Sequence, residues 1–456
     1  MNKLFEKFSI PILSIIIIFH GFILTKLIFF PYQELFTYPY LTNNGIFPYS
    51  QNFDQHFPGF LMLPVNLATF GIDTPAEMRV LAITVISLIH ALIFVITRQI
   101  TRSSRVAIMS NILFLAWHPF FEGWVLWIDN FLPLLLLPAF FFIFNGVAKR
   151  NTVHLLFAGL LLGFALIFKQ TILPLTIIVA LAILVFSKKI SYSIALLTGF
   201  FPFGLFLLAY FQLNNALNDF WYWTVVYNFT IFSKYGQKPA TFTQLVRIIS
   251  VFGFPIFGFL SKFLKQMFWL SIFIIGSLAS AITRADFVHF QPALPFVAIA
   301  SGIAIEHLIS SRKYLLIAFY ILGGMIFLTT FYKGHLGSKV FFFDKQTYQI
   351  ATRIKQYTNP KQQIFIYGAS PHLYQLSNTL PAGDIYVQQF SWFMMVAEDK
   401  MLDGLKKSDP DLVIADTSVD DGLYNIKQYA PKTYEYIQQN YIPIDNINST
   451  QFLRKK

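Results

Sequence analysis

The chain has 456 residues, of which 55% are hydrophobic, 18% aromatic and only 12% charged. A soluble domain is about 45–50% apolar even when glycine is counted, so this composition argues against an ordinary soluble protein. Cysteine is absent, which excludes disulfides and thiolate chemistry. The formal net charge of +12 would favour nucleic-acid binding in a soluble protein, but cytoplasmic loops of a membrane protein retain lysine and arginine for another reason.

The apolar residues form long blocks, which predicts an α-helical membrane protein with about eleven spans. The first block, residues 9–30, is too long for a signal peptide and lacks an A-x-A cleavage site, so we expect it to remain as the first span. Residues 60–70 are too short to cross a bilayer and are expected at the interface. The other predicted spans lie at about 80–97, 106–119, 130–147, 153–168, 171–186, 194–211, 246–260, 267–281, 290–308 and 314–331.

Basic residues mark alternate connections between the predicted spans. They precede span 1 and follow spans 2, 4, 6, 8 and 10, as Lys3, Lys7, Arg98, Arg102, Arg105, Lys149, Arg150, Lys188, Lys189, Lys262, Lys265, Arg312 and Lys313. Basic loops stay on the cytoplasmic side of a membrane. We therefore expect a multi-pass protein of the plasma (inner) membrane with a cytoplasmic N-terminus, whose other connections and C-terminal part face outward.

The composition changes near Lys333, beyond which most of the acidic residues lie. Gln363–Tyr367 and Leu412–Ala415 are predicted as buried strands, each with a turn signal nearby. Residues 371–377 and 395–407 are predicted as helices. We expect a membrane domain over residues 1–332 and a small extracytoplasmic α/β domain over residues 333–456.

The connection after span 1, residues 31–59, is rich in tyrosine, asparagine, glutamine and proline and contains Glu34 and Asp54. A carboxylate that is partly desolvated at a membrane surface can act as a general base, because desolvation raises its pKa toward the working pH. The alternative is that one of the two caps a helix or pairs with a lysine. Four prolines in residues 39–64 indicate a rigid path of short helices.

Further polar residues lie in the other outward connections. Asp129 opens span 4, where a carboxylate can also be favoured by the helix dipole. Lys169 and Gln170 end span 5, and Arg284 and His289 precede span 10. An outward base runs against the positive-inside trend and needs a partner, which a lipid phosphate would supply. The alternatives are that these bases reach nearby head groups and that the lone histidine is structural.

Motifs of soluble enzymes are missing from the sequence. There is no G-x-x-x-x-G-K-[ST] loop, no H-E-x-x-H and no CxxC. ATP-driven transport is therefore disfavoured. The predicted spans also lack the charges expected of an ion-coupled transporter. The polar groups gather at the outer rim, which favours chemistry at the membrane surface.

These residues resemble the GT-C superfamily of membrane glycosyltransferases, in the bacterial branch similar to protein O-mannosyltransferases and lipid A aminoarabinose transferases. The resemblance covers most of the chain. The first connection matches at Gln33-Glu34, Gly45, Pro48-Tyr49 and residues 53–58, FDQHFP. Later matches are Gly159–Thr171, ending in Lys169-Gln170-Thr171, then Arg284, His289-Phe290 and Leu294-Pro295, and residues 366–374 of the tail. Gln33 departs from the pattern, because the family has an acid there.

The resemblance implies an inverting transfer of a sugar from a polyprenyl-phosphate donor to an acceptor hydroxyl of a protein, glycan or lipid. Glu34 or Asp54 would be the base. Lys169 and Arg284, with His289, His56, Asp129 and Gln170, would contact the donor phosphate or sugar. Members often use a divalent metal, Mg²⁺ or Mn²⁺, for which Glu34, Asp54 or Asp129 are the candidate ligands. The alternative is a flippase or a lipid-binding scaffold of the same topology without catalysis.

Overall fold

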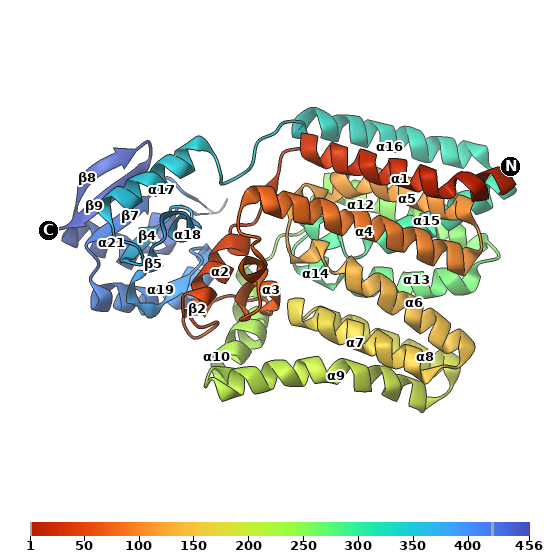
Figure 1. Ribbon diagram of the computed structural model, residues 1–456, viewed down its shortest axis with the longest axis horizontal. Helices are drawn as coiled ribbons and strands as arrows, with labels where there is room; N and C mark the ends of the chain where they lie inside the picture. The colour runs from red at the N-terminus through yellow and green to blue at the C-terminus, as the bar shows by residue number, and fades with distance from the viewer. Residues whose placement is uncertain (1, 421–423) are drawn as a thin grey trace. The chain divides into compact units, whose positions relative to one another are not determined.

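The computed structural model describes residues 2–420 and 424–456 (Figure 1). The chain divides into two compact units. The helical unit contains Met1–Phe30, Met78–Leu207 and Gln237–Lys339. The mixed unit contains Pro31–Glu77, Leu208–Gly236 and Val340–Lys456, so the connection after span 1 packs with the C-terminal region.

Every predicted span overlaps at least one helix of the structure. The helices are α1 (Asn2–Lys26), α4 (Pro75–Thr101), α5 (Ser104–His118), α6 (Pro133–Lys149), α7 (Thr152–Phe168), α8 (Ile172–Ser187), α9 (Ile190–Leu213), α12 (Phe242–Phe252), α13 (Leu264–Ser277), α14 (Ala279–Thr283), α15 (Leu294–Ser310) and α16 (Tyr314–His335). Among the residues that the structure describes, six helical segments are long and apolar enough to cross a membrane, and four shorter apolar helices, α7, α8, α13 and α15, accompany them. The prediction of an integral membrane protein is confirmed.

The predicted span over residues 246–260 is broken in the structure. Helix α12 ends at Phe252, and the chain continues as a 3-10 helix, Phe254–Leu260. Pro255 has no backbone N–H to donate, and its ring would clash with the preceding turn of an α-helix. The sequence predicted a single span here because the segments before and after the break are both apolar, so hydrophobicity alone does not mark the break.

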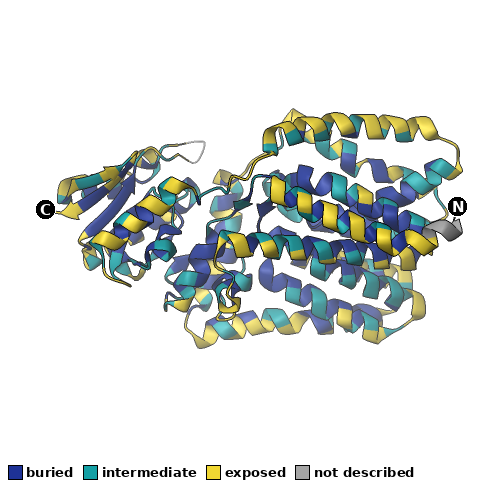
Figure 2. Cartoon of the chain, turned by 45° about the horizontal axis from the view of Figure 1, so that its top comes forward, coloured by how far each residue is buried: buried dark blue, intermediate teal, exposed yellow. Residues whose placement is uncertain are grey.

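Burial separates the inner faces of these helices from the outer ones (Figure 2). On α16 only Gly324 and Phe331 are buried. Its exposed positions include many large apolar side chains, among them Leu315, Phe319 and Ile326, each at least 63% exposed. A water-soluble protein rarely shows such a continuous apolar face, whereas hydrocarbon is a favourable solvent for it.

Helices α7 and α9 pack through glycines. Gly159 and Gly163 form a G-x-x-x-G pattern on α7, and Gly199 lies on α9. A Cβ added to Gly159 would lie 2.0 Å from the carbonyl oxygen of Leu196, and one on Gly199 would lie 2.2 Å from that of Leu156. Small residues let two backbones approach closely, which is how helices associate where no hydrophobic effect drives them together.

Polar side chains inside the helical unit bond one another. The Asn111 amide donates to the Ala107 carbonyl at 2.9 Å, so its oxygen accepts from His90 Nδ1 at 2.7 Å. His90 Nε2 then accepts from His20 Nδ1 at 2.8 Å, and His20 Nε2 from His118 Nδ1 at 3.1 Å. The orientation of one amide thus assigns the tautomers of three buried imidazoles.

The mixed unit contains a five-stranded sheet in the order β5-β4-β7-β9-β8, formed by β4 (Gln363–Tyr367), β5 (Leu380–Pro381), β7 (Leu412–Asp416), β8 (Tyr441–Ile447) and β9 (Thr450–Lys455). Strand β4 is parallel to β5 and β7, and β9 is antiparallel to β7 and β8. The helices are α2 (Glu34–Asn43), α3 (Gly59–Met62), α10 (Leu217–Trp221), α11 (Ser233–Tyr235), α17 (Lys345–Tyr357), α18 (Leu373–Ser377), α19 (Ser391–Ser408), α20 (Ile426–Tyr429) and α21 (Pro431–Asn440). Two further short strands, β1 (Phe30–Pro31) and β3 (Val125–Leu126), lie outside this sheet.

The predicted C-terminal strands and helices are present as β4, β7, α18 and α19. The hairpin of β8 and β9 was missed because most residues of β8 are exposed or half-buried, which removes the apolar signal of a buried strand. A separate pairing ties the connection after span 1 to the C-terminal region. Strand β2 (Asn52–Phe53) lies parallel to β6 (Tyr386–Val387), with Asn52 opposite Tyr386.

The glycine packing of α7 on α9 generates a stability prediction. Gly159→Ala places a methyl group against a backbone carbonyl that cannot rotate away, so we expect a loss of at least about 1–3 kcal/mol. Gly204→Ala on α9 is the control, because the nearest atom to its added Cβ is Leu166 Cδ2 at 3.7 Å. Thermal unfolding of the detergent-solubilised variants measures both. Equal melting temperatures for the two variants would contradict the close approach.

Candidate functional site

A carboxylate cluster of Glu34, Tyr38, Asp54 and His56 lies in the mixed unit. Glu34 is the first residue of α2, Tyr38 follows one turn later, and Asp54 comes directly after β2. The Tyr38 hydroxyl donates to Asp54 Oδ2 at 2.6 Å. The backbone N–H and Nδ1 of His56 both lie 2.7 Å from Asp54 Oδ1. Both oxygens of Asp54 are therefore held by the protein.

The two carboxylates of this cluster have different surroundings. Glu34 is 7% exposed and Asp54 4%. Burial raises the pKa of Glu34 to about 8, and the negative charge of Asp54 contributes to the same shift. Glu34 therefore loses its proton near the pH at which a general base must work, while Asp54 is oriented by three hydrogen bonds. The structure brings together the two acids that the sequence placed twenty residues apart.

The carboxylate cluster does not fit a divalent metal. Within residues 2–420 and 424–456, no group of three or more histidine, aspartate or glutamate side chains is arranged to hold an ion. Mg²⁺ and Mn²⁺ need several oxygen ligands, and both oxygens of Asp54 are already engaged by Tyr38 and His56. The same holds for Asp129, whose oxygens both bind Lys169.

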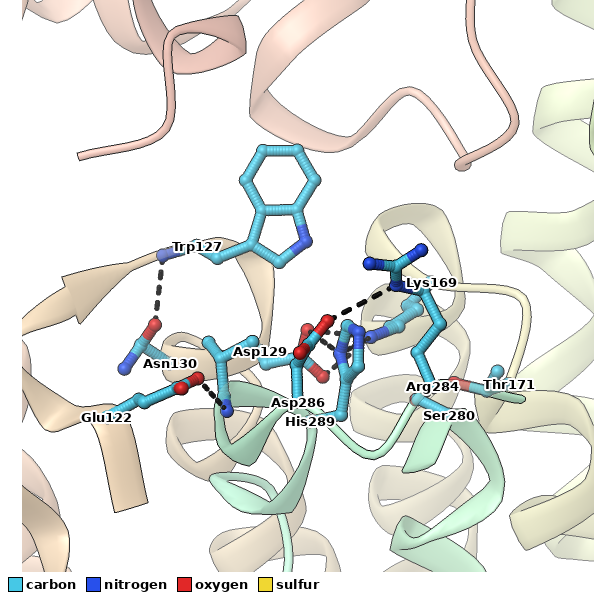
Figure 3. A network of polar contacts seen from close by, with 11 residues as sticks. Glu122, Trp127, Asp129, Asn130, Lys169, Thr171, Ser280, Arg284, Asp286 and His289 are labelled. Atoms are coloured by element: carbon cyan, nitrogen blue, oxygen red, sulfur yellow. Dashed lines mark hydrogen bonds and ion pairs between the residues drawn. The ribbon is translucent and has the colours of Figure 1, made fainter. Parts of the chain in front are cut away.

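A second set of charged residues, the ion-pair network, lies in the helical unit (Figure 3). Lys169 follows the last residue of α7, and its Nζ lies 2.6 Å from both oxygens of Asp129. His289 Nδ1 lies 3.2 Å from Asp129 Oδ2 and 3.4 Å from Lys169 Nζ. The side chains of Lys169 and Asp129 are 5% and 0% exposed. Lys169 therefore does not reach out to head groups, and its partner is a carboxylate of the chain.

A second acid, Asp286, joins the ion-pair network. Arg284 Nε lies 3.2 Å from Asp286 Oδ2, and Lys238 Nζ lies 2.5 Å from Asp286 Oδ1. Hydrogen bonding and these two cations lower the pKa of Asp286 although its burial acts in the opposite direction. Glu122 accepts a hydrogen bond from the Val288 N–H at 2.8 Å, and burial raises the pKa of Glu122 to about 7.

The residues predicted to form the site fall into these two groups. Glu34, Asp54 and His56 are in the carboxylate cluster, and Asp129, Lys169, Arg284 and His289 are in the ion-pair network. Gln170 is half-buried and follows Lys169 in the turn before α8. Asp129 does not cap a helix, because α6 begins at Pro133 with Leu132 at its N-cap.

Three members of the two groups were missed at the sequence level: Tyr38, Lys238 and Asp286. Two of them had a local signal. Tyr38 lies four residues after Glu34, on the same helix face, and Asp286 lies two residues after Arg284. Lys238 had none, because only the fold brings it to Asp286.

The fold and part of the sequence of this chain are similar to those of known proteins. The family model described as dolichyl-phosphate-mannose-protein mannosyltransferase matches residues 61–210. ArnT from Cupriavidus metallidurans, in its crystal structure bound to undecaprenyl phosphate, superposes with a TM-score of 0.61 at 12% identity, covering 99% of this chain and 97% of that one. No curated protein matches the sequence.

Two structures from Archaeoglobus fulgidus are also similar. Its oligosaccharyltransferase tethered with an acceptor peptide has a TM-score of 0.57 at 12% identity, covering 100% of this chain and 75% of that one. The oligosaccharyltransferase AglB in complex with an inhibitory peptide and a dolichol-phosphate has a TM-score of 0.52 at 12% identity, covering 99% and 74%. The chain has the GT-C fold that these structures share, and the fold expected from the sequence resemblance is confirmed.

The buried pair of Lys169 and Asp129 generates a second stability prediction. Lys169→Met leaves Asp129 buried without its cation, which should cost about 3–5 kcal/mol of stability. The double variant Lys169→Met/Asp129→Leu removes both charges and should recover most of that loss. Lys238→Met is the control, since its side chain is 55% exposed and an exposed pair contributes about 0–1 kcal/mol. A double variant that is no more stable than Lys169→Met would show that the pair is not the cause.

Proposed function

We propose that this chain is a glycosyltransferase that moves a sugar from a polyprenyl-phosphate donor to an acceptor hydroxyl on the outer side of the membrane. The observation that carries the proposal is the buried Glu34, with its raised pKa, beside the hydrogen-bonded Asp54 on a GT-C fold. The donor class is supported by two proteins of similar fold, whose structures hold undecaprenyl phosphate and a dolichol-phosphate.

In the proposed reaction Glu34 is the general base. The ionised carboxylate takes the proton of the acceptor hydroxyl while the hydroxyl oxygen attacks the anomeric carbon of the sugar. The bond from that carbon to the phosphate oxygen breaks, the phosphate leaves with the electron pair, and the anomeric configuration is inverted. Asp54 is the second candidate for this role, but its two oxygens are occupied by Tyr38 and His56, so we assign it to orienting the cluster and contacting the sugar.

We further propose that Lys169 and Arg284 bind the donor phosphate. Cations stabilise the charge that develops on a leaving phosphate. Each of these bases has a carboxylate partner, Asp129 for Lys169 and Asp286 for Arg284. Lys238 adds a further positive charge beside Asp286. A phosphate would therefore bind to an ordered set of cations whose positions the carboxylates hold, and His289 and Gln170 are proposed to assist it.

A flippase or lipid-binding scaffold of the same fold is the alternative. Such a protein needs a lipid-binding surface but has no use for a buried carboxyl group whose pKa approaches the working pH. Purified protein is to be assayed with radiolabelled undecaprenyl-phosphate mannose, glucose and aminoarabinose, and the release of each sugar to an acceptor is measured. Binding of these donors without any sugar transfer would favour the scaffold.

The proposed base generates a kinetic prediction. Glu34→Gln keeps the shape and removes the basic group, so turnover should fall by about 10²–10⁴-fold at saturating donor. Since Glu34 must be ionised to act, the wild-type kcat/KM should rise with pH and level off above about pH 8. Both quantities are measured by sugar transfer from the donor that the wild-type protein uses best.

Asp54→Asn is the matched comparison, because it removes the charge that Tyr38 and His56 hold. If Asp54 only orients the cluster, this variant keeps a rise of kcat/KM with pH at a lower rate, and the rise moves to lower pH because the charge of Asp54 no longer helps to raise the pKa of Glu34. The Glu34 assignment is wrong if Glu34→Gln folds normally and keeps more than about a tenth of the wild-type turnover.

Membrane orientation gives a separate prediction, which uses the absence of native cysteine. Ala76→Cys and Lys407→Cys, at exposed positions in the predicted outward part, should react with an impermeant thiol reagent in intact cells. Ser311→Cys, exposed in a predicted cytoplasmic connection, should react only after the cells are opened. The reverse pattern would place the carboxylate cluster on the cytoplasmic side and overturn the proposed site of transfer.

A further inference from the structure

The side chain of Asn52 is buried without hydrogen-bond partners. Its exposed fraction is 0%, and among the described residues it alone has both side-chain polar atoms, Nδ2 and Oδ1, buried and unbonded. Its backbone is fully used: its N–H donates to the Phe47 carbonyl and its carbonyl accepts from the Tyr49 N–H. Buried polar groups are almost always hydrogen-bonded, so an amide left open at both ends requires an explanation.

The strand pairing places Asn52 beside the carboxylate cluster. Asn52 is opposite Tyr386 in the parallel pair β2–β6, and residues in register project from the same face of a sheet. The Tyr386 ring lies 6.4 Å from the ring of Tyr38, whose hydroxyl donates to Asp54. Phe53 projects from the opposite face and stacks on Trp223 at 4.9 Å. The unbonded amide therefore lies on the same face of the strand pair as Tyr386, whose ring neighbours Tyr38 of the carboxylate cluster.

We propose that Asn52 is a substrate-binding residue that exchanges two hydrogen bonds with a hydroxyl group of the substrate, an inference that rests on the proposed function. An amide offers a donor and an acceptor, and a hydroxyl is the small group that satisfies both. A phosphate has only acceptors to offer and would leave Oδ1 open. The carboxylates of Glu34 and Asp54 also disfavour an anion here.

The hydroxyl has two possible sources in the proposed reaction, the sugar of the donor and the attacking acceptor. A buried water molecule, which also donates and accepts, is the structural alternative. A sugar hydroxyl, an acceptor hydroxyl and a buried water predict different effects of an Asn52 substitution on the transfer kinetics and on the stability of the protein. A substrate contact is absent in the free protein, so replacing Asn52 should not weaken the fold, whereas losing a bound water would.

The experiment compares Asn52→Leu, which has a similar size and no polar group, with Asn66→Leu in the same unit. Asn66 is also 0% exposed, but its amide is fully bonded to Asn43, Leu63 and Thr69. Asn52→Leu should lower kcat/KM for sugar transfer by about 10-fold or more while its Tm stays equal or rises, because no bonded group is lost. Asn66→Leu should lower Tm and leave kcat/KM unchanged. Asn52→Ala, which only removes atoms, is measured alongside in case leucine does not fit.

Substrate analogues identify the source of the hydroxyl. If it belongs to the sugar, one deoxy-sugar donor should be used about 10-fold less well by the wild-type protein and equally well by Asn52→Leu. If it belongs to the acceptor, Asn52→Leu should raise the acceptor KM and leave donor discrimination intact. Unchanged kcat/KM with a lowered Tm would assign a buried water only and overturn the inference while the proposed function stands. A wild-type protein that transfers none of the three sugars would instead overturn the proposed function, and this inference with it.

Discussion

An unpaired charge cannot be buried cheaply, and this constraint explains the arrangement of the helical unit. Lys169 lies at the end of an apolar helix with its side chain 5% exposed, and the only way to keep its charge there is a partner of opposite sign. Asp129 is this partner, with both carboxylate oxygens 2.6 Å from the ammonium group, and His289 also contacts Asp129. Three segments far apart in the sequence are thus held together by one electrostatic requirement. The same kind of charge pairing occurs closer to solvent, where Asp286 binds both Arg284 and Lys238.

The carboxylate cluster shows the opposite arrangement. Glu34 and Asp54 carry the same sign and are both buried. The conflict is resolved by dividing their roles, because Asp54 receives the hydrogen bonds of Tyr38 and His56 whereas burial shifts the pKa of Glu34 to about 8. Such a pair costs stability, and natural proteins keep costly polar arrangements mainly where they serve chemistry. The unbonded amide of Asn52 is a further cost at the same place.

Apart from these polar groups, the helical unit is built on close packing. The glycines of α7 and α9 bring two backbones together, and the outward face of α16 consists of large apolar side chains. Both features suit a hydrocarbon solvent, in which close backbone contact drives helix association and an exposed apolar face needs no cover. The ion pairs around Lys169 therefore lie where the apolar helices end, as Lys169 directly after α7 illustrates.

The sequence by itself determined the positions of the apolar helices, because hydrophobic blocks of span length have few other stable solutions in a protein. It also located β4, β7, α18 and α19, and it picked out Glu34, Asp54, Asp129 and Lys169 as polar residues in apolar surroundings. The break at Pro255 and the exposed hairpin β8–β9 were less visible, since the apolar pattern continues through the first and is absent from the second.

Only the tertiary structure decided which polar groups meet. The pairing of Lys169 with Asp129, the contact of Tyr38 with Asp54 and the alignment of Asn52 with Tyr386 join residues 40, 16 and more than 300 positions apart. A sequence pattern reports the period and polarity of one segment, whereas burial, and with it the pKa of Glu34 and the open amide of Asn52, depends on what the rest of the chain places around that segment.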